Sequence, residues 1–543
     1  MFLAFSVLLI AAHAPLLRLP YFWDEAGYYI PAVRDLLAGS LIPHSTPSNA
    51  HPPLVMMWLA LAWKVLGQSQ LVTRFAMLLV AAFSLTGFFR LARVVSNSTV
   101  AAASTFLVGI YPVFFAQSSL AQVDLPAAGL TFWALDAYVR QRRAKMVIWF
   151  ALAALTKETA ILVPIALIGR EVLRLLREFK DSPPQRARSF TKEFSASFFA
   201  LIVPALPLAL WYAYHYAHTG FVFGNPEFFR YNVQGNLSPL RIVLALLLRL
   251  WQTVGYLNLY ILTLACVVAM KYSAEPLQSG THIAETTDSP EPRADDRERI
   301  ADVELRPRID RSIQFAFLTI ATVYLLAMSV LGGAVLARYM LPIVPLFILI
   351  CVSTIWRRLN TWKAVLAIVA LGFVLASFVN PPYGFSPEDN LAYADYIHLH
   401  QRAEAFIEAR YPSAHVLTAW PASDELSRPY LGYVQKAMQV VRIEDFTPEQ
   451  LLSAADARSR FDVALVFSTK YQAPHSLFDR WRTWQEWKTR YFGYHVDVTP
   501  EAAALALGGS LVYVERKKGQ WVGVVEIEKA KEAELNSLDV GSP

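Results

Sequence analysis

Cysteine is almost missing from this chain. Only Cys266 and Cys351 occur among 543 residues, and both lie inside apolar runs. Two such residues suggest neither a disulfide framework nor a zinc site. The sequence also has no glycine-rich nucleotide loop, and residues from 381 onward show no spacing typical of metal ligands. Chemistry that depends on a bound nucleotide therefore has no visible phosphate loop.

Charge is also scarce. Charged residues make up 17% of the chain and hydrophobic residues 55%, with a mean hydropathy of +0.35. This composition is too apolar for a soluble protein of this length and predicts a polytopic membrane protein. The net charge is +6. In a membrane protein such an excess marks cytoplasmic loops rather than nucleic-acid binding.

The apolar runs predict an α-helical protein with about eleven membrane-spanning helices, because a bilayer core of about 30 Å needs about 20 apolar residues per helix. The first run could instead be a signal peptide, with Ala12-His13-Ala14 as a cleavage site, but it has no basic region before it. We expect an uncleaved helix. The expected spans are 2–20, 71–91, 99–118, 125–140, 146–157, 159–176, 195–216, 250–271, 313–331, 339–356 and 363–380.

The segment 52–67 is too short for a confident span, and Pro52 and Pro53 begin it. We expect a helix on the membrane surface within one external loop, 21–70. With a cytoplasmic amino terminus, every basic cluster then falls inside, as the positive-inside rule requires. The clusters are Arg90 and Arg93; Arg140, Arg142, Arg143 and Lys145; Arg170 to Arg188; and Arg357, Arg358 and Lys363.

Two further segments differ in texture. Residues 272–312 are rich in Glu, Asp, Arg, Pro and Thr, which predicts a disordered cytoplasmic loop. From 381 to 543, short apolar runs alternate with helical patterns, which predicts a soluble α/β domain on the external side. The expected strands are 414–420, 461–467, 510–515 and 521–527, and the expected helices are 391–410 and 447–458. Residues 1–380 would form the transmembrane domain.

Five polar features converge on the external face in this topology. Each has an ordinary explanation by itself: a solvated acidic loop, a local ion pair or an interface anchor. Their convergence instead indicates a site, since charged groups near a membrane are commonly functional. The features are Asp24 with Glu25, His51, Asp124, Lys157 with Glu158, and Arg338 with Tyr339.

These motifs resemble those of the GT-C glycosyltransferases, specifically the protein O-mannosyltransferases and aminoarabinose lipid A transferases. The resemblance covers roughly residues 1–380 and implies a sugar donor carried on a polyprenyl phosphate. It implies transfer outside the cytoplasm, in the plasma (inner) membrane, to a protein, lipid or glycan acceptor. The matching motifs are Trp23-Asp24-Glu25-Ala26-Gly27-Tyr28-Tyr29, His51-Pro52-Pro53-Leu54, Asp124-Leu125-Pro126, Thr156-Lys157-Glu158 and Arg338-Tyr339-Met340-Leu341-Pro342.

The resemblance implies roles for these residues. Asp24 would be the general base, with Glu25 orienting the loop or the acceptor. Lys157 and Arg338, with Tyr339 beside it, would bind the donor phosphate, and one-step displacement would invert the anomeric centre. Asp124 and His51 would position the acceptor or help bind a cation, with Glu158 in support. Pro52 departs from the family, since aminoarabinose transferases often carry Lys there.

A divalent metal is possible at Asp24, Asp124 and His51, by carboxylate and imidazole ligation. Two other classes of function remain open. A transporter would use charged groups along its path, but few charges lie deep in the predicted spans, and no inverted repeat is visible. A membrane-anchored binding protein would leave the acidic loop and Lys157 unexplained.

Overall fold

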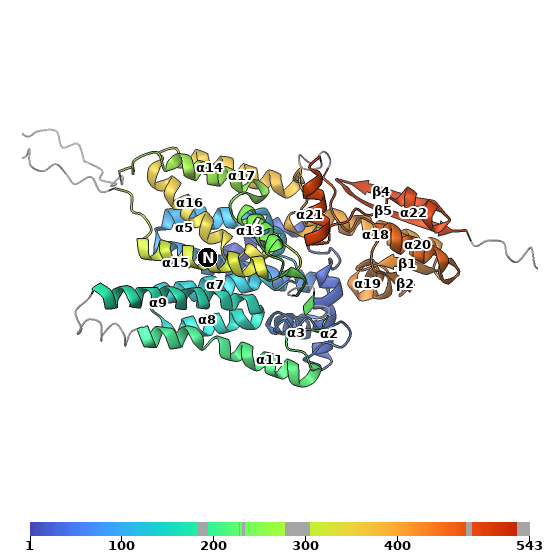
Figure 1. Ribbon diagram of the computed structural model, residues 1–543, viewed down its shortest axis with the longest axis horizontal. Helices are drawn as coiled ribbons and strands as arrows, with labels where there is room; N and C mark the ends of the chain where they lie inside the picture. The colour runs from blue at the N-terminus through green and yellow to red at the C-terminus, as the bar shows by residue number, and fades with distance from the viewer. Residues whose placement is uncertain (182–193, 227–228, 231–233, 277–304, 474–479, 529–543) are drawn as a thin grey trace, which may run out of the picture.

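The computed structural model describes residues 1–181, 194–226, 229–230, 234–276, 305–473 and 480–528. Helices form an elongated bundle, and a small sheet with its own helices lies at one end of that bundle (Figure 1). The predicted combination of a helical domain and a C-terminal α/β region is therefore present.

Helices occupy every range where the sequence predicts a span, and α3 (Leu54–Leu66) occupies the expected surface segment. Within the described residues, four helices are long and apolar enough to cross a membrane: Gln70–Val95, Phe194–Thr219, Pro239–Ala269 and Arg311–Val330. The expected number of spans stays a prediction. Besides α3, the labelled helices of the bundle are α1 (Phe2–Ala12), α2 (Ile30–Leu37), α4 (Gln70–Val95), α5 (Ser98–Ile110), α6 (Pro112–Gln117), α7 (Asp124–Val139), α8 (Arg143–Thr156), α9 (Leu162–Asp181), α11 (Ala205–Thr219), α13 (Pro239–Val254), α14 (Leu259–Ala269), α15 (Arg311–Val330), α16 (Val344–Arg358) and α17 (Trp362–Phe378).

Two predicted spans are interrupted. The range 99–118 divides at Pro112, which lacks a backbone N–H and begins α6 instead of continuing α5. The range 250–271 begins too late, because α13 starts at Pro239 and carries two arginines that lower its apparent hydropathy. It also contains a break before α14, where Leu257 and Asn258 have φ of 47° and 67°.

The predicted disordered loop 272–312 stays a prediction. Its centre, 277–304, lies outside the described residues. Its flanks are ordered: Pro276 and Leu305 form a β-bridge, and Arg306 donates to the Trp356 carbonyl at 2.6 Å. Both contacts involve backbone groups, so the sequence of the loop does not predict them.

The C-terminal region is a five-stranded mixed sheet in the order β2-β1-β3-β5-β4. Strand β1 pairs in parallel with β2 and β3, while β5 is antiparallel to both β3 and β4. Strand β2 was not predicted, because this edge strand is short and only half-buried. The elements are α18 (Ala392–Arg410), β1 (His415–Ala419), α19 (Ala422–Ser427), β2 (Gln439–Ile443), α20 (Pro448–Asp456), β3 (Val463–Phe467), α21 (Arg482–Phe492), α22 (Pro500–Leu507), β4 (Gly509–Lys517) and β5 (Gln520–Ile527).

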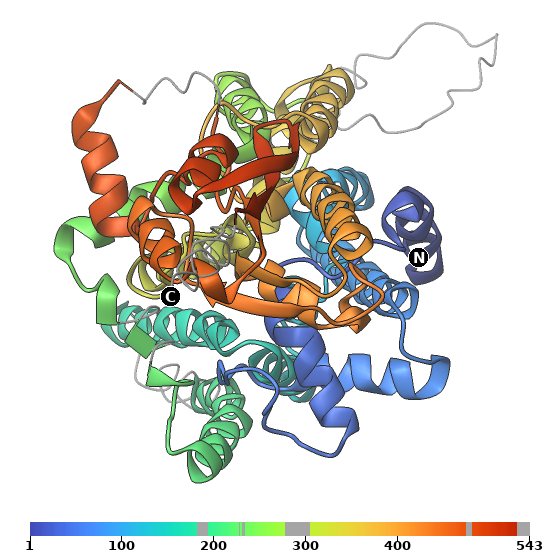
Figure 2. The ribbon, with the colours of Figure 1, turned by 90° about the vertical axis from the view of Figure 1, so that its right-hand side faces the viewer.

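The two predicted domains share a hydrophobic core. One buried cluster joins residues 19–77 and 116–123 of the bundle to residues 393–527 of the sheet region. Figure 2, viewed from the end that carries the sheet, shows the C-terminal elements lying across the bundle. Gly27 permits a close approach, since a Cβ there would lie 2.6 Å from the Trp420 Nε1. The C-terminal region therefore helps to position the loop that follows α1.

Candidate active site

Arg338 is the centre of a buried charge cluster. It lies in the 3-10 turn η7 (Ala337–Met340), between α15 and α16, and is 3% exposed. Its Nη2 donates to Asp24 Oδ2 at 2.5 Å, and its Nε lies 3.1 Å from Asp124 Oδ2. Its Nη1 forms an ion pair with Glu388. One guanidinium thus joins three carboxylates from distant parts of the chain.

Lys157 adds a second cation to this cluster. It follows α8 with extended backbone angles, so its side chain turns back toward the first residue of α7, Asp124. The Lys157 ammonium forms an ion pair with Asp124 and lies 4.0 Å from the centre of the Tyr339 ring. Asp124 therefore bridges the two cations, and the Tyr339 ring packs against the Lys157 ammonium.

Asp24 is the most open carboxylate of the cluster. Its side chain is 21% exposed, whereas those of Asp124 and Glu388 are each 4% exposed. The residue before it, Trp23, has φ of 45°, a conformation that costs free energy for a side chain of this size. Aromatic contacts hold Trp23 there, with Tyr396 at 5.7 Å and Trp420 at 5.2 Å between ring centres.

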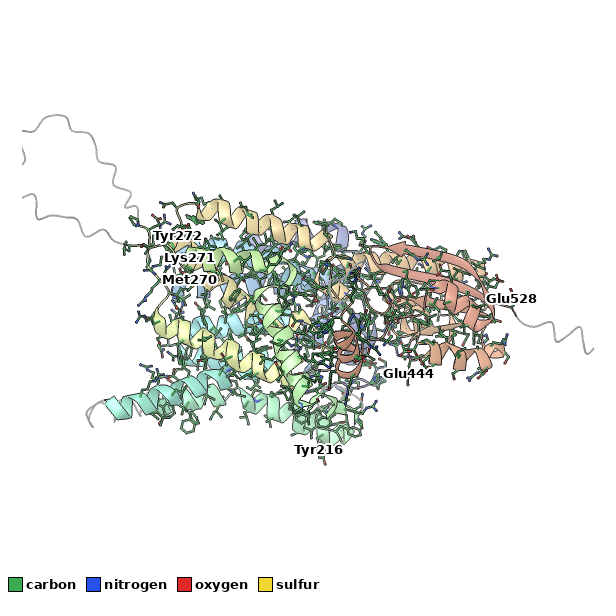
Figure 3. The ribbon with its side chains drawn as sticks, turned by 45° about the horizontal axis from the view of Figure 1, so that its top comes forward. Tyr216, Met270, Lys271, Tyr272, Glu444 and Glu528 are labelled. Carbon is green, nitrogen blue, oxygen red and sulfur yellow. The ribbon has the colours of Figure 1, made fainter. Side chains whose placement is uncertain are left out.

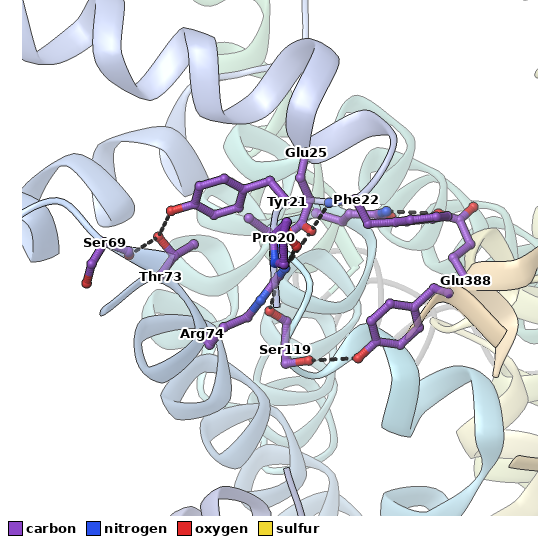
Figure 4. Close-up of polar contacts among 12 residues, drawn as sticks. Pro20, Tyr21, Phe22, Glu25, Ser69, Thr73, Arg74, Ser119 and Glu388 are labelled. Carbon is purple, nitrogen blue, oxygen red and sulfur yellow. Dashed lines mark hydrogen bonds and ion pairs between the residues drawn. The ribbon is translucent and has the colours of Figure 1, made fainter. Parts of the chain in front are cut away.

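Glu25 points away from the cluster. It is fully buried, and both of its oxygens bind the guanidinium of Arg74, one of them at 3.0 Å (Figure 4). It also accepts hydrogen bonds from the backbone N–H groups of Phe22 at 2.8 Å and Ala121 at 2.6 Å. These contacts fit the expected role in orienting the loop, and leave Glu25 no oxygen directed at an acceptor.

His51 and Glu158 form a separate pair. His51 Nδ1 lies 2.9 Å from Glu158 Oε2. A pocket beside this pair is lined by residues from the 21–70 loop and α11, among them Tyr28, Tyr29, Ser48, His51 and Trp211. The pocket places aromatic rings and polar groups of the loop beside His51.

The possible metal site at Asp24, Asp124 and His51 does not fit the geometry. Both aspartates face Arg338, and Asp124 also binds Lys157, so cationic side chains occupy the space where a metal ion would sit. His51 is engaged with Glu158 instead. Protein cations supply the positive charge of this site.

Two acids that the sequence analysis missed belong to the site. Glu388 and Asp389 lie in η8 (Pro387–Asp389), just after the last bundle helix. Tyr256 donates to Asp389 Oδ2 at 2.6 Å, and burial, together with the charge of Glu388, raises the pKa of Asp389 to about 7. Glu388 and Asp389 form an acidic pair that follows an apolar run, as Asp24 and Glu25 do. The same sequence pattern could therefore have identified these two acids.

Arg249 was also missed. This fully buried arginine of α13 donates to the Leu336 carbonyl at 2.6 Å, and its neighbour Gln252 donates to the Val335 carbonyl at 2.8 Å. Together they fasten the segment that leads into Arg338. The Arg249 guanidinium also lies 5.3 Å from the centre of the Tyr339 ring. An arginine inside an apolar run was the available signal.

Comparisons with known proteins show which family and which folds this chain is similar to. The profile of a family described as dolichyl-phosphate-mannose-protein mannosyltransferase matches residues 50–211. No curated protein matches the sequence. ArnT from Cupriavidus metallidurans bound to undecaprenyl phosphate has a similar structure, with a TM-score of 0.52, 12% identity, and coverage of 96% of this chain and 97% of ArnT. The apo state of the same ArnT gives a TM-score of 0.51, 13% identity, and coverage of 96% and 98%.

Proposed function

We propose that this chain, a member of the GT-C glycosyltransferase superfamily, transfers a sugar from a polyprenyl-phosphate carrier to an acceptor on the external side of the membrane. The observation that carries the proposal is one cluster: Lys157 and Arg338, bridged by Asp124, beside the partly exposed Asp24. The undecaprenyl phosphate bound to the similar ArnT supports a lipid-phosphate donor.

The reaction is a single displacement. The acceptor hydroxyl transfers its proton to Asp24 as its oxygen forms a bond to the anomeric carbon. The bond from that carbon to the phosphate oxygen breaks, and its electron pair leaves with the lipid phosphate. Attack opposite the leaving group inverts the anomeric centre. Lys157 and Arg338 stabilise the negative charge that develops on the phosphate.

The ion pairs of the free protein add a condition. Both cations are already neutralised by carboxylates, so a donor phosphate must compete with Asp24 and Asp124 for them. A phosphate that takes hydrogen bonds from Arg338 loosens the contact between Arg338 and Asp24. A carboxylate released in this way has an oxygen free to take the proton of the acceptor hydroxyl. Donor binding would thus activate Asp24.

The direct test follows the lipid product. Purified full-length protein is given a labelled polyprenyl-phosphate sugar and acceptor membranes from a strain that lacks the protein. An enzyme releases lipid phosphate as label enters the acceptor. A transporter or a binding protein leaves the donor intact, and an unchanged donor in the presence of competent membranes would reject the proposal.

Substitution of Lys157 or Arg338 should weaken donor binding, whereas substitution of Asp24 should not. We expect Lys157→Ala to weaken donor binding by about 10- to 100-fold, as loss of a charge-assisted contact usually does, and to lower turnover as well. Arg338→Lys keeps the charge but loses the planar fork, so it should also bind donor more weakly. Donor titration and initial rates measure the two effects.

The exposed Lys271→Ala, which removes a cation far from the cluster, is the matched control. Unchanged donor affinity in both Lys157→Ala and Arg338→Lys would contradict phosphate binding at this cluster.

The external position of residues 381–543 is part of the proposal. Figure 3 shows Glu444, in the sheet region, at the opposite end of the molecule from Lys271. We expect Glu444→Cys to react with a membrane-impermeant thiol reagent in intact cells and Lys271→Cys to react only after lysis. Both native cysteines are buried, which keeps the background low. The reverse labelling pattern would overturn the topology.

A further inference from the structure

A second cluster of ionisable groups lies in the C-terminal region, apart from the candidate active site. His400 and Glu404 are one turn apart on α18, and Glu425 faces them from α19. One imidazole nitrogen and one oxygen from each carboxylate all lie within 4.8 Å of one another. The three residues are 1%, 0% and 0% exposed. This is a closed site with no opening to solvent.

The cluster contains more hydrogen-bond acceptors than the surrounding donors can pair with. His400 Nδ1 lies 2.7 Å from Glu425 Oε2. Both oxygens of Glu404, the second oxygen of Glu425 and His400 Nε2 are buried and have no hydrogen-bond partner. In the described part of the chain, neither glutamate forms an ion pair with a lysine or arginine. Two carboxylates without compensation are costly to bury.

We propose that His400, Glu404 and Glu425 bind a divalent cation of the Zn²⁺ type. An imidazole and two carboxylates are a usual donor set for such ions. One dication would neutralise both carboxylates and occupy the unpartnered oxygens. The spacing of four residues on α18 presents His400 and Glu404 on one helix face, where both can reach a single ion.

The cation would fasten two elements that support the Asp24 loop. It would tie α18 to α19, which begins just after Trp420. The ring of Tyr396, on α18, stacks on His400 at 3.9 Å and also contacts Trp23 at 5.7 Å. Trp420 contacts Trp23 from the other side. The metal site would thus stabilise the aromatic cage around the residue before Asp24, without touching the reacting atoms.

The test measures metal content and thermal stability of full-length protein without a histidine tag. After incubation with Zn²⁺ and removal of the free ion, we expect about one Zn²⁺ per chain. Glu425→Gln and His400→Gln should each retain little. A strong chelator should lower the melting temperature of the wild type by several degrees, because loss of a bound ligand destabilises the folded state, and should leave both variants unchanged.

His415→Gln is the matched control, since His415 pairs with Asp462 in the same domain without a third acid. It should keep the metal. The competing explanation is a proton shared between the two glutamates, because burial and the charge of Glu425 raise the pKa of Glu404. In that case wild type and variants hold equally little Zn²⁺, Mn²⁺ or Ca²⁺, and the chelator changes no melting temperature. Equally low metal content in wild type and variants would overturn the proposal, and so would a melting temperature that the chelator does not change.

Discussion

Asp24→Asn should reduce sugar transfer by about 100- to 10,000-fold, the range that general-base assistance supplies. The amide keeps the shape of the carboxylate but cannot accept the proton of the acceptor hydroxyl. Donor binding should stay the same or tighten slightly, because Arg338 loses an ionic competitor for the phosphate. Steady-state rates at saturating donor, with a separate donor titration, distinguish the two effects.

The exposed Glu444→Gln removes an acid from the surface of the C-terminal region and should leave transfer unchanged. Near-normal turnover of Asp24→Asn at saturating donor would show that another group takes the proton. A loss of donor affinity in parallel with turnover would instead indicate that Asp24 acts in binding. The proposed superfamily membership would survive either result, because neither result bears on the profile match to residues 50–211 or on the likeness in fold.

Glu25→Gln should act on stability. It leaves the Arg74 guanidinium buried without a counter-charge, and removing one partner of a buried ion pair costs about 3–5 kcal/mol. Thermal unfolding in detergent should show a large loss, whereas protein that remains folded at low temperature should still transfer sugar. The double variant Glu25→Gln with Arg74→Gln should recover part of the loss, since no charge is then left uncompensated.

The Glu25 variants show whether Glu25 and Asp24 have different roles. If folded Glu25→Gln loses turnover as completely as Asp24→Asn while its melting temperature is unchanged, Glu25 acts on the acceptor and not through Arg74. A melting temperature that falls equally in Glu25→Gln and in the double variant would show that the ion pair itself contributes little.

Much of the candidate site was predictable from short motifs next to apolar runs. Asp24, Asp124, Lys157, Arg338 and Tyr339 come from four distant segments, and the structure brings all of them together. Topology explains this success, because residues at the same end of a helical bundle lie near one another. The helices themselves were predictable because continuous apolar stretches have few alternatives.

The rest depended on contacts that no local pattern encodes. The side chain of Glu25 points away from the Asp24 cluster because Arg74 on α4 binds it, and the sequence around Glu25 does not show this contact. Glu388 lies in the domain where no chemistry was expected. The His400 cluster needs a third ligand from the following helix, Glu425, and so has no regular spacing in the sequence.

The core shared by residues 19–77 and 393–527 has a consequence for biosynthesis. A ribosome makes the Asp24 loop early, but makes its packing partners on α18 and in the turn between β1 and α19 late. At about 5–20 residues per second, the loop would wait about 20–80 s before Tyr396 and Trp420 exist. During that interval Phe22 and Trp23 have no permanent partners and are exposed to misassociation. The amino-terminal loop is therefore the part of the nascent chain whose aromatic side chains stay exposed during synthesis. A chain that stopped near residue 380 would never make the partners that cover Phe22 and Trp23.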